Sequence, residues 1–459
     1  MLNSKYLFDD QKMQEFIANG FTVIKPDLSP ELHETIYRKT DEVFEKEGNP
    51  GNNVLPRIPE LQQVFDHPVV QGAFTSILGA GQVMHIHRHC HINKPHSEGG
   101  RCHKDSYWGY YKVRYHRNRW AMAFYYPQDV SLENGPTAVV PGTHYYMDRI
   151  EGLDELTRPV LGEAGTIAVV HFDIWHQAMP NRTDRNRYMM KFQFTRMEEP
   201  QQPSWSNREA SWSGTEFGDK HRVVWSQMWD WSLARQGNGA TPENGNVAKL
   251  TQTLQGDSET DRLNAAYALG AIGEPAIPGL VQTLQGENEA AQLNAAYALS
   301  AVGEPALPAL TAALKHENEQ VRGHAAFALG DIGPTAADAV PALTKTLNDS
   351  SEWVRHHAAE ALGTIAQNAD VAVPALGQAL KDGDGQVRYT AAYALARFGP
   401  AAQAALPALR DALYDDNRYA SGHSTLALQR IGTPEATEIL LDFLTTSRWC
   451  PLTSKESTY

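Results

Sequence analysis

The chain has 459 residues, a formal net charge of −14 at pH 7 and a hydrophobic share of 42%. This length exceeds what one hydrophobic core usually serves, so we expect more than one domain. The negative charge argues against nucleic acid as a partner, because binding to phosphates requires an excess of basic residues. Three cysteines are too few for a disulfide framework, which favours a reducing compartment.

The N-terminal segment has acidic residues early and lacks an apolar run of signal-peptide length. No stretch of the sequence approaches the roughly 20 consecutive apolar residues that span a bilayer. We therefore expect a soluble, cytoplasmic protein without a membrane span.

Four histidines alternate with other residues between His85 and His91. If this segment is a β-strand, alternate side chains point to the same side, so the four histidines share one face. Neighbours on one face of a straight strand lie roughly 7 Å apart, so one tetrahedral ion rarely draws four ligands from them. The run is therefore interpreted as a polar strand face and not as a metal site.

An H-x-D triplet follows at His103 and Asp105. In an extended strand these two side chains point to the same side, so an imidazole and a carboxylate can bind one metal ion. Such triplets also arise by chance, and a structural pairing of His with Asp is the alternative.

Two residues farther along the chain make the metal hypothesis more specific. A β-branched run from Ile167 to Val170 predicts a strand that leads into a turn with His176, and Arg187 precedes the next predicted strand. Two imidazoles and one carboxylate occupy one face of an iron(II) ion and leave three positions open. An oxoacid co-substrate can chelate two of these positions and O2 can take the third. A planar guanidinium suits the distal carboxylate of that co-substrate.

Over about residues 8 to 200 the sequence resembles the phytanoyl-CoA dioxygenase family. Residues 16–24 match the family's N-terminal helix, turn and strand, and residues 92–95 match the strand before the triplet. Its hairpin motif is matched by Asn-Gly-Pro at 134–136 and by Pro-Gly-Thr-His at 141–144. The resemblance implies a double-stranded β-helix, or jelly roll, with flanking helices.

The resemblance also implies an enzyme that uses iron(II), 2-oxoglutarate and O2. His103, Asp105 and His176 would be the iron ligands and the catalytic residues, and Arg187 would bind 2-oxoglutarate. A halogenase of this fold has Gly or Ala in place of the carboxylate, so the retained Asp105 implies a hydroxylase. Ala178 departs from the small hydroxyl residue that many members carry there, so the co-substrate would lose one hydrogen bond.

Three further pocket positions are implied by the same resemblance. Arg57 falls where the family has a basic contact to 2-oxoglutarate, and Cys90 and Phe124 fall where it has residues that line the pocket.

The composition of the chain changes near residue 240. Residues 236–246 form a polar, Gly-rich run that is typical of a linker, so we expect the oxygenase domain to cover 1–235. Beyond the linker an Ala-Ala-x-Ala-Leu unit, mostly with an aromatic residue at x, begins at Ala265 and returns after 30, 30, 33 and 33 residues, and in degenerate form at Ser424. Each unit ends near a turn, mostly with a Gly, and a Pro follows near the start of the next apolar stretch. This pattern predicts two amphipathic helices per repeat that stack into a solenoid.

These repeats resemble the HEAT family over residues 247–445, with a polar tail at 446–459. The Val-Arg pairs that end at Arg322, Arg355 and Arg388 match the pair before the family's second helix. HEAT arrays mostly bind other proteins, which is an analogy at the level of the fold. The alternative is an appendage that stabilises or oligomerises the enzyme.

The favoured function is a dioxygenase that hydroxylates an aliphatic C–H bond of a small-molecule or lipid-like substrate. One alternative is a protein or peptide hydroxylase whose HEAT repeats dock the substrate. Another is a non-catalytic scaffold or iron sensor, which the complete triad argues against.

Overall fold

The computed structural model describes residues 3–105, 112–235 and 246–446. The chain folds into two compact units that divide between Asp219 and Lys220. The predicted linker at 236–246 and the predicted tail at 446–459 lie outside the described residues, apart from Asn246 and Thr446. In the described part of the chain, no helix is long and apolar enough to cross a membrane.

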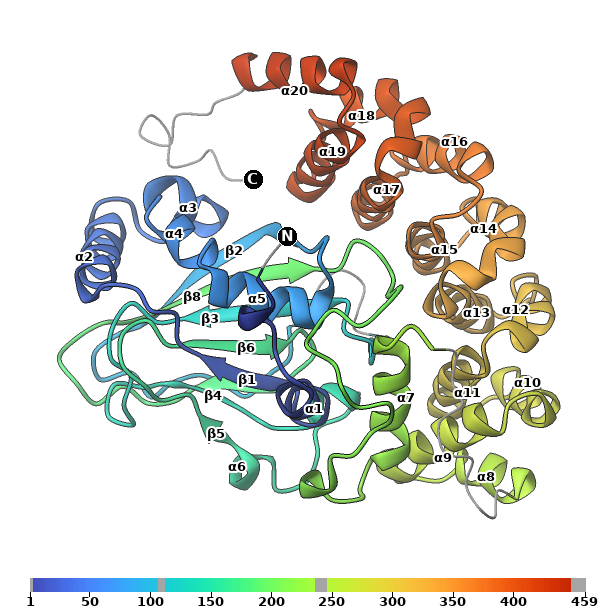
Figure 1. The fold of residues 1–459 in the computed structure, drawn as a ribbon. Coiled ribbons are helices and arrows are strands. Elements are labelled where there is room, and N and C mark those ends of the chain that lie inside the picture. Colours follow the sequence, from blue (N-terminus) through green and yellow to red (C-terminus); the bar gives the residue numbers. More distant parts are fainter. Residues whose placement is uncertain (1–2, 106–111, 236–245, 447–459) are drawn as a thin grey trace. The chain divides into compact units, whose positions relative to one another are not determined.

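The first unit is built on two antiparallel β-sheets (Figure 1). The larger sheet has the strand order β1-β6-β3-β8-β2 and the smaller sheet the order β5-β4-β7. The strands of the larger sheet are β1 (Phe21–Ile24), β2 (Val83–Asn93), β3 (Trp120–Tyr125), β6 (Ile167–His171) and β8 (Arg187–Thr195). Those of the smaller sheet are β4 (Thr137–Val139), β5 (Arg158–Pro159) and β7 (His176–Ala178). Two sheets with this non-consecutive strand order confirm the predicted jelly roll.

Helices flank these sheets, as predicted. They are α1 (Asp10–Asn19), α2 (Pro30–Glu47), α3 (Val54–Arg57), α4 (Leu61–Phe65), α5 (Pro68–Leu78) and α6 (Leu153–Leu156). Their limits follow local chemistry: the Ser29 side chain accepts a hydrogen bond from the Leu32 N–H at the start of α2. Gly20 ends α1 with a φ of 74°, which an L-residue rarely adopts.

One face of β8 packs against helix α5, and the opposite face carries Arg187 and Lys191 among its side chains. Phe74 of α5 stacks on Phe194 of β8 with the ring centroids 3.7 Å apart. Strand residues alternate between faces, so Arg187, Met189 and Lys191 point to the opposite side of the sheet. Every residue of β8 is nevertheless buried, and the polar side chains on the opposite face therefore need partners.

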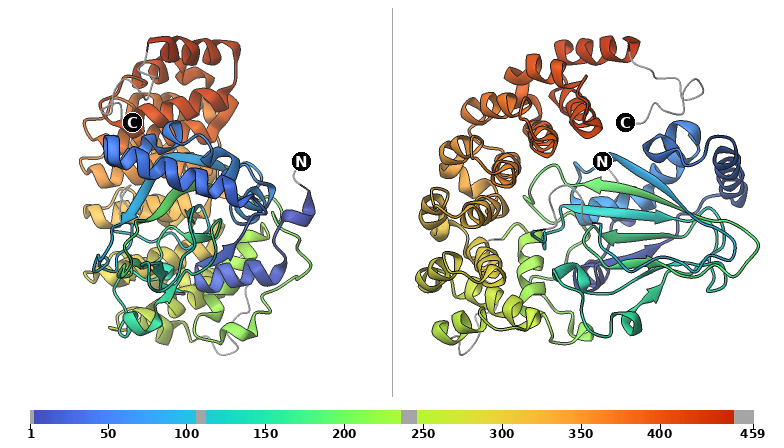
Figure 2. Two further views of the ribbon diagram at one scale, coloured as in Figure 1. Left: turned by 90° about the vertical axis from the view of Figure 1, so that its left-hand side faces the viewer. Right: turned by 180° about the vertical axis from the view of Figure 1, so that it is seen from behind.

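The second unit is all-helical and confirms the predicted HEAT solenoid (Figures 1 and 2). One row of helices consists of α9 (Glu259–Ile272), α11 (Glu289–Val302), α13 (Glu319–Ile332), α15 (Glu352–Ile365), α17 (Gly385–Phe398) and α19 (Arg418–Ile431). The other row consists of α8 (Val247–Thr253), α10 (Ile277–Leu284), α12 (Leu307–Ala313), α14 (Val340–Thr346), α16 (Ala369–Ala379), α18 (Leu406–Ala412) and α20 (Pro434–Thr446). The unit starts before the predicted linker because α7 (Arg222–Ser232) packs against α9.

Small residues let neighbouring helices of the first row approach closely. A Cβ added to Gly330 of α13 would lie 2.8 Å from the Cα of Ala361 in α15. Proline lies in the first turn of α10, α12, α14 and α18, where its missing N–H has no helical partner to lose. Pro374 differs, because α16 begins a turn earlier and holds it inside the helix.

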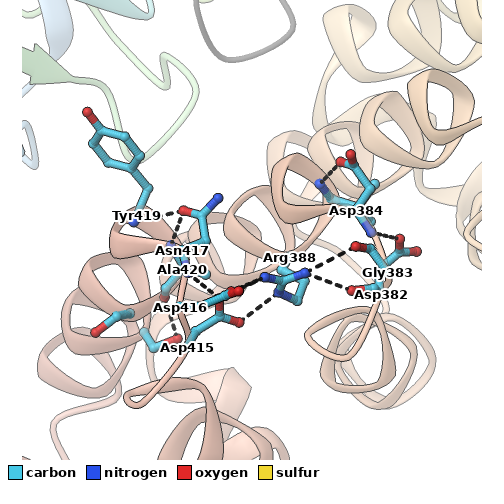
Figure 3. A network of polar contacts seen from close by, with 12 residues as sticks. Asp382, Gly383, Asp384, Arg388, Asp415, Asp416, Asn417, Tyr419 and Ala420 are labelled. Carbon is cyan, nitrogen blue, oxygen red and sulfur yellow. Dashed lines mark hydrogen bonds and ion pairs between the residues drawn. The ribbon is translucent and has the colours of Figure 1, made fainter. Parts of the chain in front are cut away.

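The arginine of each Val-Arg pair joins one repeat to the next. Arg322 donates two hydrogen bonds, of 2.6 and 2.8 Å, to the carboxylate of Asp349, which lies 27 residues along the chain. Arg355 and Arg388 repeat this geometry with Asp382 and Asp415. Figure 3 shows the last of these networks, in which Arg388 also reaches Asp416 and the carbonyl groups of the preceding turn. These bidentate pairs fix the register between successive repeats.

Candidate metal centre

A short backbone bridge brings the H-x-D triplet and the distal histidine together. The N–H of His103 donates to the carbonyl of His176 at 2.9 Å, and the N–H of His176 donates back to His103 at 2.9 Å. The two imidazole ring centroids lie 4.5 Å apart. Asp105 joins them, so that one ligand atom from each of the three residues lies within 4.8 Å of the other two.

The backbone sets the tautomer of both imidazoles. Nδ1 of His103 lies 2.9 Å from the carbonyl of Arg101, and Nδ1 of His176 lies 3.1 Å from the carbonyl of Ile174. A carbonyl only accepts hydrogen bonds, so each Nδ1 carries the proton. Each Nε2 therefore keeps its lone pair, which is the form in which histidine binds a metal.

The protonation states of His176 and Asp105 also suit the binding of a cation. Burial lowers the pKa of His176 to about 4, so this ring is neutral at physiological pH. Burial by itself raises the pKa of Asp105, but the Lys191 ammonium and the nearby imidazoles outweigh it and lower that pKa to about 2. The two groups are thus in the protonation states that metal binding requires.

The triad opens onto a cavity of about 350 Å³. Its lining residues are His91, Gly100, Arg101, His103, Thr137, His176, Ala178, Arg187 and Met189. The two imidazoles of the triad and the predicted oxoacid anchor therefore share one small chamber, whose volume is near the lower end of the range for ligand pockets.

Arg187 is buried in the wall of this cavity. Its Nε donates to the carbonyl of Gly135 at 2.7 Å, whereas its Nη1 is buried without a hydrogen-bond partner among the described residues. An unsatisfied buried donor costs free energy, so such groups usually have a ligand or an ordered water as partner. A carboxylate in the cavity would satisfy this guanidinium.

The three further pocket positions implied by the family resemblance, at Arg57, Cys90 and Phe124, lie in different surroundings. Phe124 of β3 contacts the triad, since its ring centroid lies 5.4 Å from that of His176. Arg57 donates from Nε to Glu47 at 2.6 Å, and Cys90 is buried in β2. None of Arg57, Cys90 and Phe124 is among the residues that line the cavity, so their roles stay predictions.

The histidine run forms β2, but not with one continuous face. The pairing of β2 with β8 shifts in register between Met84 and Arg88, which interrupts the alternation that the sequence predicts. His89 and His91 remain neighbours, with ring centroids 4.7 Å apart. His85 instead packs edge-on against Trp120, at 5.1 Å.

Lys191 is a site residue that the motifs do not predict. Its ammonium donates to Oδ2 of Asp105 at 3.0 Å. The alternation of side chains along the strand could have predicted its place, because Lys191 lies four positions after Arg187 and therefore on the same face of β8. Thr137 was also not predicted; it pairs across the small sheet with Ala178, where the hydroxyl residue of many family members is missing.

Residues 16–189 match the family model described as phytanoyl-CoA dioxygenase, and residues 247–320, 307–373 and 373–450 match HEAT repeats. No curated protein matches the sequence.

Solved structures that match part of this chain include non-heme oxygenases. One is the non-heme monooxygenase ThoJ with nickel, at 17% identity and a TM-score of 0.34 over 44% of this chain and 89% of that chain. Another is the alpha-ketoglutarate-dependent carbocyclase SnoK, at 19% identity and a TM-score of 0.35 over 43% and 88%. A third is EctD from S. alaskensis with 2-oxoglutarate and 5-hydroxyectoine, at 13% identity and a TM-score of 0.36 over 44% and 82%. The chain thus combines a domain of the phytanoyl-CoA dioxygenase family with a C-terminal array of HEAT repeats.

Proposed function

We propose that the N-terminal domain is an iron(II)- and 2-oxoglutarate-dependent dioxygenase that hydroxylates an aliphatic C–H bond of a small-molecule or lipid-like substrate. The observation that carries the proposal is the convergence of His103, Asp105 and His176, whose ligand atoms lie within 4.8 Å of one another. Two imidazoles and one carboxylate on one side of an iron(II) ion leave positions for a chelating co-substrate and O2.

The residues present fit such an ion. Both imidazoles have their Nε2 lone pairs available, because each Nδ1 is held by a backbone carbonyl. The ionised Asp105 supplies the negative charge that offsets part of the charge of the dication. Bound iron, together with 2-oxoglutarate and O2, would supply the oxidising chemistry that no side chain can perform.

In this proposal Arg187 holds the co-substrate. Its guanidinium would bind the distal carboxylate of 2-oxoglutarate, and the buried Nη1 would gain the partner that it lacks among the described residues. The bond from Nε to Gly135 fixes the direction of the guanidinium before the ligand arrives, which reduces the entropy lost on binding. Thr137, in the same wall, offers a hydroxyl across from Ala178.

The substrate class is supported by the size of the chamber. A cavity of about 350 Å³ that must also hold 2-oxoglutarate leaves room for a small reacting group. The HEAT repeats favour a second candidate, in which the reacting group belongs to a protein that the solenoid docks. Both candidates use the same metal centre and differ only in what presents the C–H bond.

The test is 2-oxoglutarate turnover by the full chain with iron(II), ascorbate and a library of metabolites, measured as succinate released. His103→Ala and Asp105→Ala should abolish both iron binding and turnover. His89→Ala, a change of a nearby histidine outside the triad, should leave both intact. Loss of the metal in His89→Ala would mean that the wrong cluster has been chosen. Iron binding without turnover on any substrate would favour the scaffold or iron-sensor alternative.

A further inference from the structure

A second cluster of metal-ligating side chains lies in the HEAT array. His356, His357 and Glu360 all belong to α15, and one ligand atom of each lies within 4.8 Å of the other two. The residues at 356 and 360 are one helical turn apart, so they face the same side of the helix. Among the described residues, this cluster and the N-terminal triad are the two groups of histidines, cysteines and carboxylates with such a geometry.

Both imidazoles have buried nitrogens without hydrogen-bond partners. Nδ1 of His356 lies 2.9 Å from the hydroxyl of Thr390 in α17, and its Nε2 is buried and without a partner among the described residues. Neither ring nitrogen of His357 has a hydrogen-bond partner there, although Nδ1 lies 3.3 Å from Oε2 of Glu360. Burying the two Nε2 atoms without partners is costly, because each gives up its hydrogen bond to water. The Nε2 atoms of His356 and His357, which have no hydrogen-bond partner among the described residues, therefore point to a missing partner.

Aromatic side chains pack around the buried His357, and Glu360 lies nearer the surface. His357 is fully buried, and the Trp353 ring meets it edge-on with the centroids 5.0 Å apart. The ring of Phe327 in α13 also contacts His357, with the centroids 5.9 Å apart. Glu360 is the most accessible member, since 18% of its side chain is exposed. A cation can therefore enter beside the carboxylate, and the aromatic walls then exclude water from the imidazoles.

We propose that His356, His357 and Glu360 bind one divalent first-row transition-metal ion, for which Zn²⁺ is the probe. Imidazole nitrogens and a carboxylate oxygen suit such ions, with bonds of about 2.0–2.2 Å and ligand atoms about 3.4 Å apart in a tetrahedron. The proposal therefore requires side-chain rotations that bring the three ligand atoms from within 4.8 Å of one another to this spacing. The Thr390 hydroxyl bonded to Nδ1 orients the His356 ring and leaves its Nε2 for the metal.

The role that follows is structural. The cluster lies on α15, which packs against both α13 and α17 in the middle of the array. An ion bound to one nitrogen of each imidazole and to the Glu360 carboxylate would stabilise the contact of one repeat with its two neighbours. The site is independent of the oxygenase triad, although both offer two imidazoles and one carboxylate and so compete for the same ions.

The test uses the full chain with His103→Ala and Asp105→Ala, which removes the first site. The protein with both substitutions, called the background protein below, should retain one equivalent of Zn²⁺ after dialysis, measured by elemental analysis. The unmodified protein should retain two. Adding Glu360→Gln should weaken the remaining binding at least 100-fold by calorimetric titration. Glu352→Gln, which changes an exposed carboxylate at the start of the same helix, should leave it unchanged.

Glu360→Gln carries the test because it conserves size, whereas truncating the fully buried His357 risks unfolding the helix. Circular dichroism in the presence of a chelator should show that the Gln variant is folded. Zn²⁺ should also raise the unfolding temperature of the background protein and not that of the Glu360→Gln variant. A background protein that retains no Zn²⁺, or equal binding with and without Glu360→Gln, would overturn the proposal and leave the cluster as a buried His–Glu contact.

Discussion

The ammonium of Lys191 donates a hydrogen bond of 3.0 Å to Oδ2 of Asp105, and both side chains are buried. The two residues are 86 positions apart in sequence, and β8 brings the lysine to the carboxylate. A buried carboxylate without a cation would be strongly destabilising, so Lys191 supports the domain when no metal is bound. The same ammonium repels an incoming dication, so the pair balances the stability of the metal-free domain against its affinity for metal.

Lys191→Met should separate these two effects. The metal-free protein should lose about 3–5 kcal/mol of stability, because Asp105 is left buried without its cation. Its affinity for a divalent ion should rise at least tenfold, since the competing ammonium is gone. Urea unfolding without metal and calorimetric titration with Co²⁺ would measure the two quantities.

Lys104→Met is the matched control for this prediction. Lys104 is also a buried lysine, but it donates to the carbonyls of Thr143 and Tyr146. Its loss should destabilise the protein without raising the affinity for metal. Weaker metal binding in Lys191→Met would instead mean that the lysine positions Asp105 for coordination.

Arg187→Lys should affect the co-substrate and spare the metal. A lysine keeps the charge but cannot form the planar pair of hydrogen bonds, and it cannot hold the bond to Gly135 in the same geometry. We expect the KM for 2-oxoglutarate to rise at least tenfold, with iron affinity unchanged. The control is Arg196→Lys, because Arg196 is equally buried but donates to the carbonyls of Asn118 and Ile77. An unchanged KM in Arg187→Lys would remove this residue from the co-substrate site.

Gly323→Ala should destabilise the solenoid although it lies in a helix. Alanine normally favours a helix interior by roughly 1 kcal/mol over glycine. At this position, however, the new Cβ would lie 1.9 Å from the ring of Trp353, which is itself buried. Overpacking of this kind typically costs about 1–3 kcal/mol, so thermal unfolding should begin at a lower temperature.

The control for that substitution is Gly383→Ala. A Cβ at Gly383 would meet nothing within 4 Å, so the unfolding temperature should barely change. A more stable Gly323→Ala variant would show that Trp353 can move away at little cost.

The ion pairs between repeats should make the solenoid sensitive to acid. Burial raises the pKa of Asp382, but the hydrogen bonds from Arg355 and a neighbouring backbone N–H outweigh it and leave that pKa below its usual value. A carboxyl group whose pKa is lower in the folded state stabilises the fold above its unfolded pKa of about 3.9, and this stabilisation is lost as the pH falls below that value. Asp382→Asn should therefore be less stable than the unmodified protein near neutral pH, and the difference should shrink below about pH 4.

Urea unfolding at a series of pH values would measure this difference. Glu287→Gln, a change of an exposed carboxylate in another turn of the solenoid, should show no such dependence. A difference between Asp382→Asn and the unmodified protein that stays constant with pH would argue against a contribution from the Arg355–Asp382 pair.

The sequence by itself predicted both folds, because their signals are local and periodic. The recurring Ala-Ala-x-Ala-Leu unit requires helices that stack, and the Gly and Pro positions mark where they end and begin. The strand period predicted that His103 and Asp105 share a side, and the flanking motifs related His176 and Arg187 to them. The helical repeats and the shared side of His103 and Asp105 need only the order of residues along one element, whereas the relation to His176 and Arg187 rests on motif spacing and on the family resemblance.

The tertiary structure decided everything that depends on contacts between distant segments. The bridge between His103 and His176, the carbonyls that set their tautomers and the pairing of Lys191 with Asp105 all arise from strand pairing across the sheets. The register shift in β2, which divides the histidine run, is likewise a property of its pairing with β8. The orphan nitrogens of His356 and His357 become apparent only when α13 and α17 bury them. Burial and hydrogen-bond partners are set by the whole fold, so a local pattern can predict which residues meet but not the chemical state in which they meet.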